Sequence, residues 1–510
     1  MLRHLLKPID YLLDGITMYR LLLYYLVVLL AAAIGLSAAG YLHYSAIDIA
    51  ISAATLVIAC WVINHIFARI FEVPVNPESS ILTGLILSLI ITPTFTNFGF
   101  LFLLAAAGLA MASKYLLTFR TKHVFNPAAI AVVLTAIGPR QHASWWVGTA
   151  VLLPFVIAGG VLVMRKTRRE HMVLVFLLAT TVTTAVLSVL THGHIGADLR
   201  NMVLSSAAFY LGFVMLTEPY TSPTVHKWQL WYAALVGVLL APQVHIGSVY
   251  TSPEIALVIG NVFAFVVSPK HHLLITVKQK LSVARSTAEF VFTRPAQFAF
   301  QPGQYMEFTL PHDRPDARGA RRWFTLASSP TEPDLRLGVK FYERGSSFKA
   351  ALYSLDKQTP MVAAQLAGDF VMPKDTDKKL AFIAGGIGVT PFRSMVKYLV
   401  DSGEQRSVRM LYAAKTADDI AYRDVFEAAR QAMDIQTTYV LSDAAAPSTA
   451  PHTVNGLITS ELIQQQIPDY KERFFFISGT HPMVEAMQDI LADVGVPAGH
   501  IKIDFFPGYA

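Results

Sequence analysis

Cysteine and charge are both scarce in this chain. The 510 residues contain one cysteine, Cys60, which lies within an apolar run. A single thiol excludes structural disulfides, thiolate-ligated iron–sulfur clusters and a CxxCH haem attachment within the chain. Charged residues make up 15% of the sequence, whereas hydrophobic residues make up 54%. Any redox chemistry here must therefore use cofactors that are not held by cysteine.

The few charges are unevenly distributed. The first 270 residues hold 15 Lys+Arg and 9 Asp+Glu, while the remaining 240 hold 26 of each. The net charge of +6 therefore belongs to the first part. This contrast predicts a membrane domain over residues 1–270 joined to a water-soluble half. The first apolar run starts only near residue 21 and lacks a cleavage site, so we expect it to remain as a membrane span.

Ten apolar segments predict a polytopic helical domain: 21–41, 48–70, 80–92, 97–117, 126–138, 146–164, 171–190, 203–217, 229–244 and 253–268. Three of them, 80–92, 126–138 and 203–217, are short, because a bilayer core of about 30 Å needs about 20 helical residues. We expect these three to be broken helices.

Basic residues predict the orientation, because Lys and Arg collect in cytoplasmic loops. With the N-terminus inside, thirteen of the fifteen basic residues fall in the cytoplasm, and only Arg140 and Arg200 fall outside. The sequence thus predicts a multi-pass protein of a bacterial-type inner (plasma) membrane. Both termini and the polar half would be cytoplasmic.

A weak internal repeat is also present. "ILTGLILSLIITPT" (81–94) is similar to "AFYLGFVMLTEPYTSPT" (208–224), and Pro93 and Pro219 are 126 residues apart. "FNPAAIAVV" and "TSPEIALVI" share this offset through Pro127 and Pro253. Five segments per repeat make the second half run upside down, so the sequence predicts inverted five-helix repeats whose broken helices build a binding site. The helix at Pro127 would begin on the cytoplasmic side and its partner on the opposite face.

Two motifs in this half resemble a known family. "SKYLLTFRTKHVFNPAA" (113–129) and "FVMLTEPYTSP" (213–223) resemble the NqrB/RnfD family, membrane subunits that carry electrons through flavins. The resemblance implies a flavin near Asn126, Pro127, Thr217, Glu218 and Pro219. The family's Ser-Gly-Ala-Thr site for covalent FMN is missing, and the corresponding loop reads "LTHGHIGADLRNMVLSS". The expected cofactor here is therefore non-covalent FMN or riboflavin.

The polar half changes pattern twice. From about residue 273 the alternating runs "LLITVKQKLS", "AEFVFTRP" and "QYMEFTLP" predict an antiparallel β-barrel over residues 271–376. After about residue 378, the buried strands "KLAFIAGG", "SVRMLYAAK" and "ERFFFISG" alternate with helical patterns. This alternation predicts a parallel sheet with crossover helices over residues 377–510.

"RRWFTLASSP" resembles the Arg-x-Tyr/Phe-Ser/Thr flavin motif of the ferredoxin-NADP reductase family, which implies an FAD-binding barrel followed by an α/β nucleotide-binding domain. In that motif, Arg322 would pair with the flavin pyrophosphate, which suits a planar guanidinium. Phe324 would pack beside the isoalloxazine or ribityl chain, and the Thr325 hydroxyl would lie near the flavin N5. The resemblance implies further FAD contacts from "PGQY" and "VKFYERGSSFKAAL": Gly303, Gln304, Val339, Lys340, Gly345, Ser346 and Ser347.

"FIAGGIGVTPF" (382–392) predicts the dinucleotide turn. A glycine-rich turn between a strand and a helix lets backbone N–H groups approach a dinucleotide. The turn lacks the GxGxxG fingerprint and instead resembles the reductase form Gly-Gly-x-Gly-x-Thr-Pro, in which Thr390 contacts the nicotinamide nucleotide. The residues implied are Gly385, Gly386, Gly388, Thr390 and Pro391.

Two further sites complete the reductase resemblance. In "FISGTHPMVEAM" (476–487), Ser478 stands where the family has a cysteine near the hydride-transfer point, and Gly479 follows it. Near the C-terminus, an aromatic residue (Phe505, Phe506 or Tyr509) would stack on the flavin. The alternative for this tail is a final edge strand of the sheet.

The coenzyme stays open between NADH and NADPH. Lys415 or Arg423 would accept a 2'-phosphate on the adenosine ribose, whereas Asp418 or Asp419 would repel it.

These patterns lead to one main functional prediction and two alternatives. The main prediction is a membrane oxidoreductase that moves electrons from cytoplasmic NAD(P)H through FAD to a membrane flavin. A quinone or an extracytoplasmic electron-accepting protein would receive them, and no nucleic acid is expected as a partner. A haem-containing ferric reductase or NADPH oxidase needs histidine pairs 13 or 14 residues apart, and the first 270 residues hold none. The other alternative is a nucleotide-regulated inverted-repeat transporter. Carboxylates within the spans, which mark ion paths, are scarce, so the sequence does not favour a built-in sodium pump.

Overall fold

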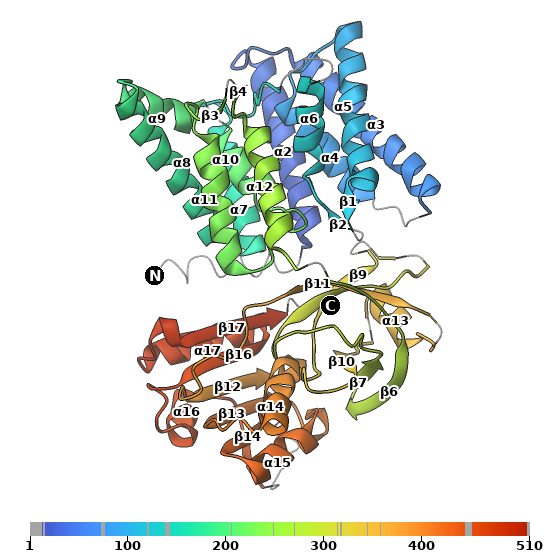
Figure 1. Ribbon diagram of the computed structural model, residues 1–510, viewed down its shortest axis with the longest axis vertical. Helices are drawn as coiled ribbons and strands as arrows, with labels where there is room; N and C mark the ends of the chain where they lie inside the picture. Colours follow the sequence, from blue (N-terminus) through green and yellow to red (C-terminus); the bar gives the residue numbers. More distant parts are fainter. Residues whose placement is uncertain are drawn as a thin grey trace. The chain divides into compact units, whose positions relative to one another are not determined.

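The chain folds into two compact units, Met1–Ser268 and Pro269–Ala510, which are described separately (Figure 1). The computed structural model describes residues 13, 16–72, 77–119, 122–137, 143–205, 207–247, 249–269, 271–313, 315–316, 319–343, 345–357, 359–443 and 451–506. At residues 77, 122, 246, 505 and 506 it describes the backbone alone.

The first unit is helical. Its helices are α2 (Met18–Ala38), α3 (Ala46–Ile70), α4 (Pro77–Ile90), α5 (Asn97–Leu116), α6 (Pro127–Ile137), α7 (Leu153–Thr167), α8 (Glu170–Leu190), α9 (Ile195–Leu204), α10 (Ala208–Tyr210) with the π-helical η1 (Leu211–Met215), α11 (His226–Leu240) and α12 (Pro253–Val267). Four of those described, α2, α3, α5 and α8, are long and apolar enough to cross a membrane, while α4, α6 and α12 are shorter. The helical fold class predicted for this half is confirmed.

The side chains of α8 are arranged as lipid requires. Leu178, Val182 and Val186 point outward and are at least half exposed, whereas the hydroxyls of Thr184 and Ser188 face the interior. Water would favour the reverse arrangement, so this outer surface fits a hydrocarbon environment.

The two halves of this unit repeat each other. A two-residue antiparallel hairpin, β1 (Thr118–Phe119) with β2 (Lys122–His123), precedes α6, and the matching hairpin β3 (His245–Ile246) with β4 (Val249–Tyr250) precedes α12. Figure 1 shows the two hairpins at opposite ends of the unit. Likewise α3 packs on α5 as α8 packs on α11, and α5 packs on α6 as α11 packs on α12. This arrangement is that of an inverted repeat.

Two predicted segments differ from the structure. The run 146–164 becomes a helix only at Leu153, because the chain before it satisfies the end of α4. The N–H groups of Ser144 and Trp145 donate to the Ile90 carbonyl at 3.0 and 2.9 Å, and the Trp146 indole donates to the Ser88 carbonyl at 2.9 Å. A helix that stops inside a membrane needs such internal donors. The run 203–217 is also not one helix, since α9 ends at residue 204 and α10 begins at 208.

The second unit begins with an antiparallel barrel. Its strands are β5 (His272–Ile275), β6 (Val277–Ala284), β7 (Thr287–Phe292), β8 (Tyr305–Thr309), β9 (Arg321–Thr325), β10 (Leu335–Lys340) and β11 (Met361–Ala367), with α13 (Ser347–Tyr353) beside them. They form the sheets β10-β7-β6 and β5-β11-β8-β9. Phe290, Phe308, Leu337 and Phe348 belong to one buried core.

The rest of the second unit is a six-stranded parallel sheet in the order β15-β14-β13-β12-β16-β17. The strands are β12 (Leu380–Gly385), β13 (Val408–Ala414), β14 (Ile435–Leu441), β15 (Thr453–Asn455), β16 (Phe474–Thr480) and β17 (Ile501–Phe506). The connections include η2 (Gly386–Val389), α14 (Thr390–Ser402), η3 (Ala417–Asp419), α15 (Arg423–Ala432), α16 (Ser460–Gln466) and α17 (His481–Asp493), with η4 (Ala498–His500) before the last strand. The predicted barrel and parallel sheet are both confirmed.

Candidate functional site

The strand order of the parallel sheet reverses at β12. From β12 the chain moves outward through β13, and it later returns on the other side of β12 with β16. Ligands of such sheets bind at the carboxyl ends of the strands where the order reverses. The predicted dinucleotide turn follows β12, and Ser478 and Gly479 lie at the end of β16. The structure therefore brings these two predicted motifs together.

Gly388 shows how closely the two motifs approach. A Cβ atom on Gly388 would lie 2.5 Å from the Ser478 carbonyl oxygen and 2.7 Å from the Gly479 Cα. Gly385 is similarly confined, because its Cβ would lie 2.1 Å from the Met483 sulfur. Gly386 has open space but adopts φ +53°. Each glycine of the turn thus meets a steric or conformational requirement.

Two buried hydroxyls near the predicted chemistry have no partner among the described residues. They are Thr325 Oγ1 at the end of β9 and Ser478 Oγ in β16, whose side chains are 3% and 0% exposed. Leaving such a group unsatisfied costs about 1–3 kcal/mol. A bound flavin and nicotinamide would supply polar atoms at these positions, so the residues fit those groups. Thr390 differs, because its hydroxyl donates to the Ile387 carbonyl at 3.2 Å.

The chain at the end of β9 is hydrogen-bonded to the "PGQY" turn (302–305). The Leu326 N–H donates to the Gln304 carbonyl at 3.0 Å. Gly303 has φ +94°, and a Cβ there would lie 2.1 Å from the Phe370 carbonyl oxygen. This turn therefore admits only glycine and holds the backbone beside Thr325.

The remaining predicted flavin residues have different environments. Phe324 packs in the barrel core between Phe308 and Phe348, at ring distances of 5.9 and 5.8 Å. Val339 is buried in the same core. Lys340 reaches out of β10 to Asp419, with 3.5 Å between Nζ and Oδ1.

The start of α13 is linked to β9 through Asp316. The Ser346 hydroxyl caps the helix by accepting from the Lys349 N–H at 3.3 Å. Gly345 has room for a side chain, with its nearest neighbour 3.4 Å from an added Cβ. The Ser347 N–H donates to Asp316 Oδ2 at 3.2 Å, and Arg322 Nη2 donates to Asp316 Oδ1 at 3.0 Å. Asp316 was not predicted, and no sequence pattern singles it out.

A buried ion pair, Arg393 with Glu332, connects the end of β9 to α14. Arg393 of α14 donates to both carboxylate oxygens of Glu332 and, at 3.0 Å, to the Ala327 carbonyl just beyond β9. Burial alone would lower the pKa of Arg393, but its hydrogen bonds to Glu332 and the charge of that carboxylate outweigh burial and raise it. Ser394 Oγ adds a bond to the Ser328 carbonyl at 2.6 Å. These contacts fix the position of the end of β9 against the start of α14.

The loop after β13, where the sequence predicts the adenosine ribose, has one acidic side chain that is largely buried, Asp419. Asp419 accepts from the hydroxyl and N–H of Thr416 at 2.9 and 3.2 Å as well as pairing with Lys340. Burial would raise the pKa of Asp419, but these hydrogen bonds and the lysine charge outweigh it and lower the pKa. Asp418 and Lys415 are both exposed. The loop does not separate NADH from NADPH.

The C-terminal tail forms the edge strand β17 as far as residue 506. Residue 505 pairs with Gly479 in the sheet. The structure thus contains the edge strand that the sequence left as the alternative. Tyr509 lies outside the described residues, and the side chain of Phe505 is not described, so flavin stacking stays a prediction.

In the first unit, the predicted flavin residues form part of a buried hydrogen-bond network. Asn126 Oδ1 caps α6, and Asn126 Nδ2 donates to Glu218 Oε2 at 2.7 Å. The Asn126 N–H donates to Asn261 Oδ1 at 2.8 Å, and Thr221 Oγ1 donates to Glu218 Oε2 at 3.1 Å. Asn126 belongs to the first repeat and the others belong to the second. The network therefore joins the broken helices of the two repeats.

The other predicted residues border this network. Pro127 opens α6, and Thr217 Oγ1 donates to the carbonyl of Phe213 in η1 at 2.7 Å. Pro219 directly follows Glu218. Sequence reasoning missed Asn261, although a polar residue inside an apolar run is the signal that would have found it. It also missed the buried Glu254, which accepts from the Trp145 indole at 2.8 Å.

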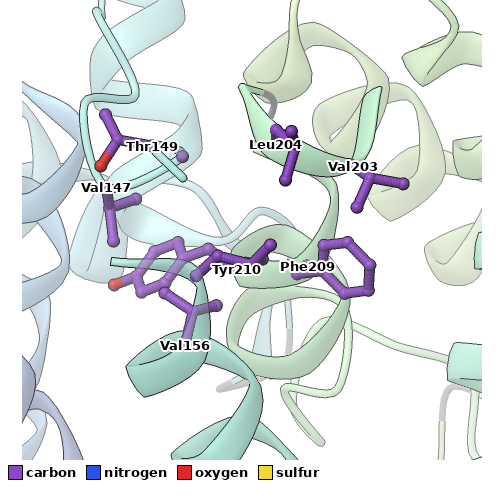
Figure 2. A pocket seen from close by; sticks show the side chains of 9 residues that line it. Val147, Thr149, Val156, Val203, Leu204, Phe209 and Tyr210 are labelled. Carbon is purple, nitrogen blue, oxygen red and sulfur yellow. The ribbon is translucent and has the colours of Figure 1, made fainter. Parts of the chain in front are cut away.

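A small cavity of about 10 Å³ lies between the chain before α7 and the start of α10. Figure 2 shows the Tyr210 ring between the side chains of Val147 and Val156. The hydroxyls of Tyr210 and Thr149 are buried there without partners among the described residues. The volume suits about one water molecule. The cavity in this conformation does not fit a flavin ring.

Two family models match the chain. Residues 136–271 match the NQR2, RnfD, RnfE family, and residues 382–489 match the oxidoreductase NAD-binding domain. These matches confirm the predicted combination of an NqrB/RnfD-type membrane part with a reductase-type part, and with it the oxidoreductase class.

Curated relatives match about two fifths of the chain. The reductase subunit of glycine betaine monooxygenase from Chromohalobacter salexigens is 25% identical over 219 residues, which are 42% of this chain and 59% of that protein. The flavohemoprotein of Pseudomonas aeruginosa is 28% identical over 212 residues, which are 41% of this chain and 51% of that protein. The chain thus spans somewhat more than half the length of these two relatives.

Among solved structures, the Amycolatopsis cytochrome P450 reductase GcoB is 22% identical, with 48% of this chain and 72% of that chain covered at a TM-score of 0.42. A ferredoxin NADP+ reductase from Neisseria gonorrhoeae with bound FAD and NADP is 15% identical, with 46% and 98% covered at a TM-score of 0.40.

Proposed function

We propose that this chain, in which an NQR2/RnfD/RnfE-type segment is joined to an oxidoreductase NAD-binding domain, is an NAD(P)H-dependent membrane oxidoreductase. Its second unit would bind FAD and NADH or NADPH, and its first unit would deliver the electrons to a quinone or an extracytoplasmic electron-accepting protein. The observation that carries the proposal is the approach of the dinucleotide turn to Ser478, which only a glycine at position 388 permits. The name of one relative, the reductase subunit of glycine betaine monooxygenase, supports the same chemistry.

The residues of the second unit have separable roles in this proposal. Arg322 would hold the flavin pyrophosphate, and the Thr325 hydroxyl would hydrogen-bond the flavin ring. Thr390 and the glycines of the turn would bind the nicotinamide nucleotide, and Ser478 would lie beside the nicotinamide. A bound flavin supplies the ability to take up a hydride, an electron pair, and to release the electrons singly.

The first unit is proposed to carry a non-covalent FMN or riboflavin near Asn126, Pro127, Thr217, Glu218 and Pro219. The family match over residues 136–271 covers Thr217, Glu218 and Pro219, which supports this site. We assign no reaction step to a membrane flavin. We also propose the inner membrane as the location, with both termini cytoplasmic.

Flavin stoichiometry tests the proposal. The purified protein would be precipitated with acid and its released flavins would be identified. Release of FAD together with FMN or riboflavin would support both cofactor sites. Release of FAD alone would rule out the proposed flavin of the first unit. The absence of FAD contradicts the reductase assignment, and a sharp Soret band would favour the haem alternative.

A further inference from the structure

Asp316 lies between Arg322, which is proposed to hold the flavin pyrophosphate, and the start of α13. Its Oδ1 accepts from Arg322 Nη2 at 3.0 Å, and its Oδ2 accepts from the Ser347 N–H at 3.2 Å. Its own N–H donates to Ser347 Oγ at 2.8 Å, and His312 Nε2 lies 3.0 Å from the same oxygen. One carboxylate thus bridges the arginine of β9 and the start of α13.

The arginine in this bridge is deeply placed. The Arg322 side chain is 8% exposed, and its guanidinium carbon lies 5.4 Å from the centre of the Phe348 ring. Its Nη1 donates to the Gly319 and Arg321 carbonyls at 3.0 and 2.6 Å. These neighbours are uncharged, whereas Asp316 brings a negative charge to the same guanidinium.

A phosphate requires the same donors as this carboxylate. Guanidinium groups bind carboxylate and phosphate through the same paired N–H geometry. A phosphate oxygen placed on Arg322 would also lie close to the Asp316 carboxylate, and two anions at that distance repel each other. The carboxylate and a phosphate would therefore compete for the positive charge of Arg322.

Resting on the FAD site of the proposed function, we propose that Asp316 is a carboxylate latch on Arg322, whose negative charge competes with the FAD pyrophosphate for this guanidinium. This competition weakens FAD binding. A flavin without phosphate does not meet this competition.

Charge removal at one position tests the latch. Asp316→Asn keeps the shape of the side chain and removes its negative charge. Asp313→Asn removes the same charge from an exposed residue of the same loop. The full-length protein and both variants would be stripped of flavin in detergent and titrated with FAD and with riboflavin. Arg322→Ala identifies which FAD signal belongs to this site, because it removes the anchor.

We expect Asp316→Asn to bind FAD about tenfold more tightly, which corresponds to about 1.4 kcal/mol. Asp313→Asn should match the parent protein, and riboflavin affinity should not change in either variant. An Asp316→Asn variant with unchanged or weaker FAD affinity overturns the latch while leaving the FAD site intact. If Arg322→Ala removes no FAD signal, the proposed FAD site and the latch both fail. An Asp316→Ala variant with a parent-like unfolding temperature provides the same comparison if Asp316→Asn folds poorly.

Discussion

The contact between the dinucleotide turn and β16 gives a sharp prediction for Gly388→Ala. The added Cβ would lie 2.5 Å from the Ser478 carbonyl oxygen, whereas ordinary contacts begin at 3.4 Å. The two backbones must therefore separate by 3.4 − 2.5, or about 0.9 Å. Overpacking of this kind costs about 1–3 kcal/mol.

The separation should affect chemistry more than folding. A displacement of about 1 Å can lower an enzymatic rate about 100-fold, because the reacting atoms lose their alignment. We expect Gly388→Ala to slow NAD(P)H-dependent bleaching of the flavin by about this factor, measured by stopped-flow absorbance. FAD content should stay unchanged, because the FAD residues lie on the barrel.

Gly403→Ala is the matched control. Gly403 follows α14 with φ +70° and has nothing within 4 Å of an added Cβ. Its replacement strains the backbone by about 1–3 kcal/mol without crowding the turn. Gly403→Ala should therefore lower the unfolding temperature while keeping the bleaching rate within a few-fold. A Gly388→Ala protein that reduces its flavin at the parent rate would refute the proposed role of this contact.

Three further predictions concern single side chains. Burial raises the pKa of Asp469, but its bonds to Arg473 and Lys379 outweigh burial and lower it to about 2. Since a lowered carboxyl pKa stabilises the fold above the unfolded value of about 3.9 and this effect is lost as the pH falls through the folded value, Asp469→Asn should cost about 1 kcal/mol at pH 6 and only a small part of that at pH 2. Denaturant unfolding at both pH values checks this, and an equal loss at both would contradict it. Asn261→Leu leaves the Asn126 N–H without its acceptor and should cost about 1–3 kcal/mol, lowering the unfolding temperature in detergent while FAD content is kept; an unchanged temperature would show that the network does not join the repeats. Ser478→Ala removes a buried hydroxyl without a described partner, so its unfolding temperature should not fall while flavin bleaching slows, and a fall in stability at the parent rate would assign the hydroxyl a structural role.

Short local motifs allowed the barrel and the parallel sheet of the second unit to be predicted from the sequence. Arg322, Thr325 and the glycines at 385, 386 and 388 belong to short motifs that a few neighbouring letters reveal, whereas the contact that confines Gly388 comes from Ser478, far away in sequence. The internal offset between Pro127 and Pro253 likewise indicated the repeat, which the matching hairpins before α6 and α12 bear out.

Other features depend on partners far away in sequence. The run from residue 146 looks like the start of a helix, but the N–H groups of Trp145 and Val147 donate to the Ile90 and Leu89 carbonyls at the end of α4. Hydropathy cannot show a backbone partner of this kind. Asp316 is equally ordinary as a loop aspartate, and only the fold places its carboxylate on Arg322. Whether an apolar run continues as a helix or ends is a tertiary property for the same reason.

Electron transfer across a membrane tests the central claim most directly. The protein would be reconstituted in vesicles with NAD(P)H on the side of the second unit and an impermeant one-electron acceptor on the other side. We predict that the acceptor is reduced and that Arg322→Ala abolishes its reduction. Flavin bleaching by NAD(P)H without reduction of the enclosed acceptor would contradict transmembrane electron transfer and favour a nucleotide-regulated transporter.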